Sequence, residues 1–212
     1  VIGSNGSGKT SMLNIICGSS YVDSGSVIMN GEDITNKKEF LRYNDIGRVY
    51  QNPSMGTCPD MTILENMALA DNKNKSFGLG RCVNKKRIDY YKSLVEQCNM
   101  GLENRMGVQV GTLSGGQRQA LALVIANMTN VDLLILDEHI AALDPKSSEI
   151  VMGLTNELVL KNNITTMMVT HNLRFAAEYG NRLVMMHSGN AILDIRDEEK
   201  KNTPVEDILK IF

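Results

Sequence analysis

The most informative segment of the sequence is Gly3-Ser4-Asn5-Gly6-Ser7-Gly8-Lys9-Thr10, which follows the apolar pair Val1-Ile2 and precedes a run of helical periodicity. The segment fits the pattern G-x-x-x-x-G-K-[ST] where that pattern is meaningful, between a strand and a helix. Its glycines allow successive backbone N–H groups to turn inward around a polyphosphate, and the helix N-terminus that follows adds partial positive charge. The segment therefore predicts a phosphate loop, residues 3–10, that binds nucleotide phosphates.

Two side chains at the end of the phosphate loop have distinct expected roles. Lys9 is long enough to reach the β- and γ-phosphates of a nucleotide, and the Thr10 hydroxyl can ligate Mg²⁺. The predicted nucleotide contacts of the loop are Ser4, Asn5, Gly6, Ser7, Gly8, Lys9 and Thr10.

Helical and extended patterns alternate along the chain outward from this loop. Helices are predicted over residues 10–17, 62–70, 85–98, 117–127, 145–161 and 173–179. Strands are predicted over residues 46–50, 133–136, 165–169, 182–186 and 191–195, and a polar loop over residues 71–84. Asn30-Gly31 after Val27-Ile28-Met29 indicates a hairpin. Since alternating strands and helices require crossover connections, we predict an α/β fold with a mainly parallel core sheet and a small antiparallel β element.

The composition limits the class of protein. The chain has 212 residues, 42% hydrophobic and 22% charged, which suits the core of one ordinary domain. A formal charge of -2 leaves no excess of basic residues for a phosphate backbone, so we predict no nucleic-acid partner. No apolar run approaches the ~20 residues that cross a bilayer. The four cysteines are widely spaced, which favours reduced thiols over a zinc site.

A second candidate group follows the apolar run Leu133-Leu134-Ile135-Leu136. Such a run suits a strand covered on both faces, and it delivers Asp137 and Glu138 to the carboxyl edge of the sheet, where open α/β folds bind ligands. Asp137 can hold Mg²⁺ directly or through water, and Glu138 can orient or deprotonate a water that attacks the γ-phosphate. His139 follows, and the sequence does not decide between a site contact and a packing role.

Leu113-Ser114-Gly115-Gly116-Gln117 opens another helix and makes a second helix N-terminus suited to anions. A single nucleotide bound by the phosphate loop alone would not require a second anion-binding helix N-terminus. With this segment the sequence resembles the nucleotide-binding subunits of ATP-binding cassette (ABC) transporters, which are P-loop NTPases whose five-residue signature presses on the γ-phosphate of ATP held by the partner subunit. The resemblance implies that the cofactors are ATP and Mg²⁺, and that ATP is contacted by Ser114, Gly115, Gly116 and Gln117.

The resemblance covers essentially the whole chain, because the other family motifs occur in order. Gln51 is in the Q-loop position, where the family's glutamine touches Mg²⁺ and the attacking water. Asp144 ends the D-loop Ala142-Leu143-Asp144 and is expected to help place the groups around the nucleotide across a dimer interface. His171 is in the position of the switch histidine, which contacts the γ-phosphate. The resemblance therefore implies catalytic roles for Glu138, His171 and Gln51, and metal contacts from Thr10, Gln51 and Asp137.

The resemblance also implies partners and a location. Two copies are expected to pair head to tail, with the phosphate loop of one facing the signature of the other, so that closure forms two composite ATP sites. Residues 51–61 and the helical region after them are expected to receive a membrane permease, with a substrate-binding protein as an indirect partner. The protein is then a Mg-dependent ATPase in the cytoplasm, peripheral on the inner face of the cell membrane, that couples dimer closure to import.

Smaller motifs narrow this expectation. Asp137-Glu138-His139 and Pro53-Ser54-Met55-Gly56-Thr57 resemble an importer group associated with aromatic amino-acid uptake, of tryptophan or tyrosine. The alternative is a soluble, non-transport ABC ATPase that acts on a macromolecular partner such as a ribosome or DNA. The interval from Lys9 to Ser114 suits an inserted helical lobe but not the long coiled coils of chromosome-maintenance members.

We expect a single ABC ATPase domain over residues 1–212, with the helical lobe at about residues 60–128. Val1-Ile2 is expected to be the end of the strand that leads into the phosphate loop. The sequence is then expected to begin inside the cassette, after the family's first antiparallel strands and the aromatic residue that stacks on adenine.

Overall fold

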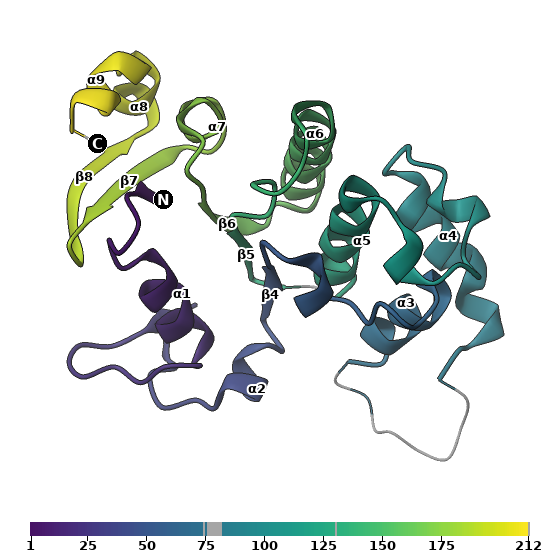
Figure 1. Cartoon of the computed structure of the whole chain (residues 1–212). Helices are drawn as coiled ribbons and strands as arrows, with labels where there is room; N and C mark the ends of the chain where they lie inside the picture. The colour runs from purple at the N-terminus through teal and green to yellow at the C-terminus, as the bar shows by residue number, and fades with distance from the viewer. Residues whose placement is uncertain (74, 76–81, 130, 212) are drawn as a thin grey trace. The chain divides into compact units, whose positions relative to one another are not determined.

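The computed structural model describes residues 1–73, 75, 82–129 and 131–211. The chain divides into two compact units, of which unit 1 combines Val1–Tyr43 with Met167–Phe212 and unit 2 is Asn44–Thr166 (Figure 1). Much of the polar loop predicted at residues 71–84 lies outside the described residues. Over the part of the chain that is described, no helix combines the length and apolar character needed to cross a bilayer. The single domain with a helical lobe at about residues 60–128 stays a prediction.

The sheet of unit 1 carries the start of the phosphate loop. Its strand order is β1-β7-β8. The strand β1 (Ile2–Gly3) pairs in parallel with β7 (Arg182–His187), which pairs antiparallel with β8 (Asn190–Arg196). The strands predicted at residues 182–186 and 191–195 are therefore confirmed.

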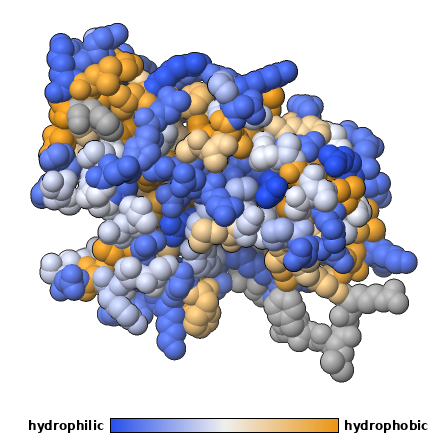
Figure 2. Space-filling view, viewed as in Figure 1, coloured by the Kyte–Doolittle hydropathy of each residue, from blue (hydrophilic) through white to orange (hydrophobic). Residues whose placement is uncertain are grey.

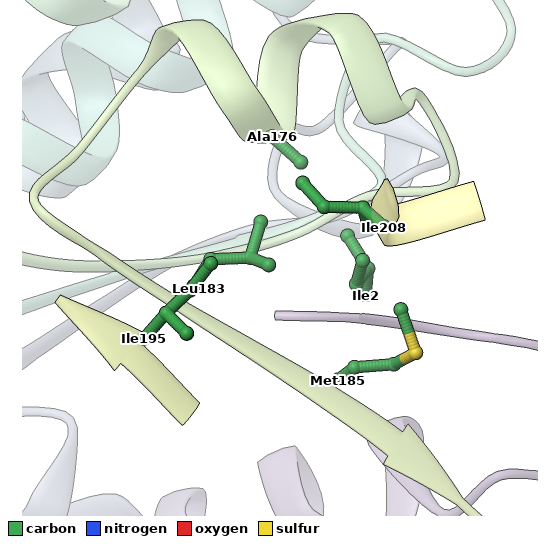
Figure 3. Close-up of a cluster of buried hydrophobic side chains, with 6 residues drawn as sticks. All are labelled: Ile2, Ala176, Leu183, Met185, Ile195 and Ile208. Atoms are coloured by element: carbon green, nitrogen blue, oxygen red, sulfur yellow. The ribbon is translucent and has the colours of Figure 1, made fainter. Parts of the chain in front are cut away.

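Helices in unit 1 cover this sheet. α1 (Lys9–Cys17) follows the phosphate loop and α7 (Leu173–Glu178) precedes β7, as predicted. The last residues form α8 (Asp197–Asn202) and α9 (Val205–Ile211), which the sequence analysis did not anticipate. Figure 3 shows how α9 joins the core, with Ile208 beside Ile2 in a buried cluster. The members of that cluster are Ile2, Ala176, Leu183, Met185, Ile195 and Ile208.

The predicted hairpin is present in unit 1. It consists of β2 (Ile28–Met29) and β3 (Glu32–Asp33), which pair antiparallel. Asn30 and Gly31 connect them with φ of 52° and 81°, the positive values that a type I′ turn requires at both central positions. A short helix, α2 (Glu39–Arg42), follows the hairpin.

Unit 2 contains the strand that carries the acidic residues. β4 (Ile46–Val49) pairs in parallel with β5 (Leu133–Asp137), with Ile46 opposite Leu133 and Val49 opposite Leu136. The third strand of this sheet, β6 (Thr165–Val169), begins in unit 2 and ends in unit 1. Residues 134–136 of β5 are fully buried, as predicted for a strand covered on both faces.

The helices of unit 2 pack around α5 (Gly115–Asn127). α5 contacts β4, α6 (Pro145–Asn162), α3 (Ile63–Asp71) and α4 (Ile88–Glu96). The close contact with β4 depends on Gly47, where a Cβ would lie 2.7 Å from the Ala126 carbonyl oxygen. Short 3₁₀ turns complete the unit at η1 (Pro53–Met55), η2 (Lys85–Arg87), η3 (Leu102–Asn104) and η4 (Val110–Thr112). The predicted α/β class, with parallel pairs, an antiparallel β element and an inserted group of helices, is confirmed.

The C-terminal helices of unit 1 are only partly buried. Leu209 and Ile211 of α9 expose about half of their surface, at 54% and 48%. Figure 2 shows apolar atoms, in orange, gathered at the upper left over the region of α8 and α9. The buried face of α9 therefore stabilises the sheet while its opposite face remains apolar and accessible.

Candidate functional site

The phosphate loop lies in unit 1 between β1 and α1, as its sequence predicts. The buried Lys9 ammonium donates to the carbonyl oxygens of Gly3 at 2.8 Å and Ser4 at 3.0 Å, so the side chain folds back along the loop. The helix that follows begins at Lys9 with Gly8 as its N-cap, a residue that has no side chain with which to cap the first turn. Backbone N–H groups at this helix end are therefore available to an anion.

Two glycines of the loop occupy positions that other residues would strain. Gly3 has φ of +154°, and a Cβ there would lie 2.4 Å from the Met186 carbonyl oxygen and 2.7 Å from Ser7 Oγ. Gly8 has φ of +100°, in the left-handed region that L side chains rarely adopt. The glycine spacing of the motif thus reflects both close packing on β7 and the turn into α1.

The turn between β7 and β8 supports the phosphate loop from outside the motif. The backbone N–H of Gly189 donates to the Ser7 carbonyl oxygen at 3.0 Å. Ser188 and Gly189 have φ of 47° and 81°, both positive as in a type I′ turn. The sequence analysis missed this contact, although the Ser-Gly dipeptide between two strands is a turn signal that could have marked the hairpin.

A buried arginine fixes the far end of α1. Arg42, 2% exposed, donates to the carbonyl oxygens of Ile15 at 2.7 Å and Ile16 at 2.9 Å, which belong to the last turn of the helix. It also donates to the carbonyl oxygens of Lys37 and Thr35. A cation at a helix C-terminus satisfies carbonyl groups that have no intrahelical partner and favours the helix dipole. Sequence reasoning gave no role to Arg42, because its partners lie 26 and 27 residues away.

His171 reaches the same sheet edge as the phosphate loop within unit 1. The end of β6 lies alongside β1, because the Thr170 N–H donates to the Val1 carbonyl oxygen at 3.1 Å and the Val1 nitrogen donates to Met168. The phosphate loop follows β1 and the exposed His171 follows β6, so both leave neighbouring parallel strands at their carboxyl ends. This placement agrees with the predicted pairing of the switch histidine and the phosphate loop.

Gln51, Asp137 and Glu138 form a second group, at the sheet edge of unit 2. Val49 and Leu136 are register partners, so Gln51 and Glu138 each lie two residues beyond the same rung of the parallel pair. Glu138 has φ of 48°, an uncommon value for a residue with a side chain and one that recurs at functional positions. The structure thus brings these three predicted residues to one edge.

The signature and the D-loop contact each other in unit 2. An ideal Cβ on Gly115 would lie 3.4 Å from Leu143 Cδ2, and one on Gly116 would lie 3.1 Å from Ser147 Cβ. Asp144 caps α6 by accepting the Ser147 N–H at 3.1 Å, and the hydrogen bonds from Ser147 lower the pKa of the Asp144 carboxyl. The helix beginnings of α5 and α6 therefore form one surface.

The beginning of α5 is closed by its own side chains. Ser114 Oγ accepts the Gln117 N–H at 3.3 Å, and Gln117 Oε1 accepts the Ser114 N–H at 3.2 Å. This reciprocal arrangement is a capping box, and Ser114 remains exposed. Two of the predicted ATP contacts of the signature, Ser114 and Gln117, thus already bond to each other within the chain.

His139, whose role the sequence left open, packs in the core of unit 2. It is 1% exposed, and its Nε2 lies 3.3 Å from Thr155 Oγ1. Thr155 donates its hydroxyl proton to the Val151 carbonyl oxygen at 2.7 Å, so the imidazole must be the donor to Thr155. Burial lowers the pKa of His139 to about 4, so the ring is neutral near pH 7. The packing alternative is therefore the one the structure supports.

The predicted metal contacts have the chemistry that Mg²⁺ prefers. Thr10 offers a hydroxyl oxygen, Gln51 an amide oxygen and Asp137 a carboxylate, and all three are hard oxygen donors. Asp137 currently accepts a hydrogen bond from Arg48 Nη2 at 2.7 Å. Gln51 and Asp137 lie at one sheet edge of unit 2 and suit Mg²⁺ as oxygen donors, and Thr10, in unit 1, stays a predicted ligand.

Comparisons with known proteins agree with the motifs. The family described as "ABC transporter" matches residues 1–141. A tyrosine transport ATP-binding protein of Clostridioides difficile (strain R20291) is 46% identical over 212 residues, which are 100% of this chain and 84% of that protein. A nucleotide-free ATP-binding cassette from an ABC transporter is similar with a TM-score of 0.80 and 28% identity, over 99% of this chain and 82% of the other.

A further solved structure is relevant to assembly. It is a dimeric ATP-binding cassette in a post-hydrolysis state bound to ADP and Pi, similar with a TM-score of 0.75 and 27% identity over 92% of this chain and 83% of the other. The phosphate loop, the signature and the acidic strand end follow one another along the chain in the order that the family requires. The chain belongs to the ABC transporter family, as one of its ATP-binding, ATP-hydrolysing subunits.

Proposed function

We propose that this chain drives the import of an aromatic amino acid, with tyrosine as the first candidate, by binding and hydrolysing ATP in a head-to-tail dimer. The 46% identity with a tyrosine transport ATP-binding protein along the whole of this chain supports tyrosine as the substrate. The observation that carries the ATPase proposal is the phosphate loop, with its buried Lys9 and its open helix N-terminus.

Each residue of the proposed site has one task. Lys9 and the loop N–H groups of one copy bind the β- and γ-phosphates, and Ser114 and Gly116 of the second copy bind the γ-phosphate from the other side. Mg²⁺, when bound by Thr10, Gln51 and Asp137, neutralises charge on the phosphates.

Three further side chains act on the attacking water and the γ-phosphate. Glu138 accepts a proton from the water as it attacks the γ-phosphate. Gln51 orients that water, and His171 donates a hydrogen bond to the γ-phosphate. Asp144 holds the D-loop in place through its cap on α6.

Hydrolysis changes the interface between the two copies. ATP bridges the phosphate loop of one copy and the signature of the other, so its cleavage removes the ligand that both copies share. The cycle thus converts phosphoryl transfer to water into opening and closing of the dimer.

The motion reaches the membrane through residues 51–61 and the helical region after them, where a permease subunit binds. Asn66, 4% exposed, holds this segment in shape, accepting the Cys58 N–H at 2.7 Å and donating to the carbonyl oxygens of Cys58 and Met61. Met55 and Met61 nevertheless expose 68% and 39% of their surface. An ordered segment with exposed flexible apolar side chains suits a protein partner. The subunit therefore works in the cytoplasm, on the inner face of the membrane.

The ATPase proposal is tested by the Glu138→Gln variant, with Glu198→Gln on the exposed surface of α8 as the matched control. We expect the turnover of ATP by Glu138→Gln to fall on the order of 100-fold or more, because the water loses its proton acceptor. The control should match the unmodified protein. Unchanged turnover in Glu138→Gln would rule out the role given to this residue.

The import proposal is tested by reconstituting this subunit in vesicles with its permease subunit and substrate-binding protein. We expect tyrosine to stimulate ATP hydrolysis and to accumulate in the vesicles, and Met55→Glu to lower both without affecting ATP binding. Stimulation by an amino acid that is not aromatic, with none by tyrosine, would contradict the substrate.

A further inference from the structure

A buried arginine contacts the proposed metal-binding carboxylate in unit 2. Arg48 lies on β4 opposite Ile135, two residues before Asp137 on the neighbouring strand, so both side chains lie on the same face of the sheet. Its Nη2 donates to Asp137 Oδ2 at 2.7 Å, and the two side chains are 7% and 18% exposed. This is an ion pair of low solvent exposure, whose charges are screened less than those of a surface pair.

The guanidinium of Arg48 is held in place by its surroundings. Its central carbon lies 4.7 Å from the centroid of the Tyr50 ring, within the range of a cation–π interaction. The Tyr50 carbonyl oxygen accepts a hydrogen bond from Gln119 Nε2 at 3.0 Å, and Gln119, on α5, is 1% exposed. Arg48 is thus fixed between Asp137 and the residue that precedes Gln51.

If Asp137 binds Mg²⁺ as proposed, two cations would share one carboxylate. An arginine side chain stays protonated at every pH at which the protein is folded, so its charge at Asp137 is permanent. Mg²⁺ bound to the same carboxylate would be repelled by that charge, and Arg48 already occupies Oδ2.

We propose that Arg48 competes with Mg²⁺ for Asp137, and so sets how strongly Mg²⁺ is coupled to ATP binding. Arg48 is a positioning residue in this scheme: it neutralises and orients Asp137 in the metal-free protein and yields Oδ2 as the metal binds. The inference rests on the metal role of Asp137 in the proposed function.

The test measures how much Mg²⁺ strengthens the binding of the non-hydrolysable ATP analogue AMP-PNP. The quantity is the ratio of the dissociation constant in EDTA to that in Mg²⁺, determined for the intact protein by calorimetry. Arg48→Gln removes the charge and keeps a donor, whereas Arg48→Lys keeps the charge. Arg182→Gln, which breaks the exposed pair with Asp194 in the β7–β8 hairpin, is the control for a change of net charge.

We expect Arg48→Gln to raise the ratio about tenfold, because a unit charge near the metal is removed. Arg48→Lys should stay within about threefold of the unmodified protein, and Arg182→Gln should not change the ratio. An unchanged or lower ratio in Arg48→Gln would overturn the inference. Asp137→Asn separates this failure from that of the proposed function: its ratio should fall toward one, and an unchanged ratio would remove the metal role of Asp137 and the inference with it.

A measurement on the unmodified protein covers the case in which Arg48→Gln does not fold. The side-chain Nε–H resonance of Arg48 is assigned by its loss in Arg48→Lys. Adding Mg²⁺ to the protein saturated with AMP-PNP should shift this resonance, since the guanidinium changes partners. A resonance that stays in place would overturn the competition.

Discussion

The two helix N-termini that meet ATP in the proposed dimer are built in opposite ways. α1 begins after Gly8, whose φ is 100°, and its N-cap has no side chain. α5 begins after Ser114, with a complete capping box to Gln117. Side-chain caps satisfy the N–H groups that a helix end leaves without partners, so α5 is stable on its own while α1 keeps these groups for an anion.

Because of this difference, we expect the N-terminus of α1 to bind nucleotide before the N-terminus of α5 does. The phosphate loop is ready in the single subunit, because Lys9 is buried against the loop and α1 offers its N–H groups. In the signature, Ser114 Oγ accepts the Gln117 N–H, so its hydroxyl proton is what this side chain has left to donate to a phosphate. In the proposed dimer, nucleotide is therefore captured first by the phosphate loop, and the signature joins when a second copy arrives.

The largest effect is expected from Lys9→Met, which keeps much of the side-chain volume but removes the charge. ATP turnover should fall on the order of 100-fold or more, since a preorganised cation at the γ-phosphate is lost. Ser114→Ala should lower turnover much less, because the backbone N–H groups at the start of α5 can still bind the phosphate. The steady-state rates of the two variants, with Lys201→Met on α8 as control, check this order, and equal losses would break the comparison.

Gly3→Ala tests how tightly the phosphate loop is packed. Its Cβ would lie 2.4 Å from the Met186 carbonyl oxygen, which is backbone that cannot move aside easily, so we expect a loss of about 2–4 kcal/mol in the free energy of unfolding. Gly115→Ala, whose Cβ would meet Leu143 at an ordinary 3.4 Å, should cost less than about 1 kcal/mol. Urea unfolding of both variants measures the difference, and similar losses would show that the two regions are equally tolerant.

The control for these glycines is Gly153→Ala in α6, where a Cβ would meet nothing within 4 Å. A helical interior favours alanine over glycine by roughly 0.5–1 kcal/mol, so this variant should be more stable than the unmodified protein. A destabilised Gly153→Ala would show that urea unfolding is not reporting local fit.

Acid should lower the free energy of unfolding through His139, the residue after Glu138. The pKa of His139 is about 4 in the folded protein and about 6.5 in the unfolded chain, so the unfolded chain binds the proton more tightly. The stability from the neutral ring is present above pH 6.5 and is lost as the pH falls toward 4, by about 2 kcal/mol at pH 5. Urea unfolding at about pH 7.5 and pH 5 should show a loss that His139→Gln lacks. The same loss in both proteins would assign the acid sensitivity elsewhere.

The smallest effect concerns the cap itself. Ser114→Ala removes the acceptor for the Gln117 N–H and should cost about 1 kcal/mol of stability. Ser4→Ala in the phosphate loop, where no helix is capped by this side chain, should change stability by less than about 0.5 kcal/mol. Thermal unfolding of the two variants measures this difference, and an equal cost would mean that the capping box does not stabilise α5.

The sequence was informative wherever the physical signal is local. The phosphate loop, the Asn30-Gly31 turn and the apolar run of β5 are specified by adjacent residues, and the structure has each of them as predicted. Contacts between distant residues left no such signal. The hydrogen bond from Gly189 to Ser7 and the ion pair of Arg48 and Asp137 could not be predicted from a local pattern. Each joins residues far apart in the sequence that only the fold brings together.

The C-terminal helices and His139 illustrate the same limit. Ile208 shares the short helix α9 with other apolar residues such as Leu209 and Ile211, and only the sheet of unit 1 decides that Ile208 is the one buried beside Ile2. His139 follows two candidate site residues in sequence, yet its ring points into the core, where Thr155 accepts its hydrogen bond. The burial of Ile208 and of His139 could therefore not be predicted from their positions in the sequence.

In the proposed dimer, ATP joins the phosphate loop of one copy to the signature of the other. Light scattering on the Glu138→Gln protein, which keeps ATP uncleaved, is the most direct measurement of this assembly. We expect monomers without nucleotide and dimers when ATP and Mg²⁺ are added, with Lys9→Met in the same background remaining monomeric. Monomers of Glu138→Gln at saturating ATP, or dimers that form equally well without it, would rule out an ATP-dependent dimer.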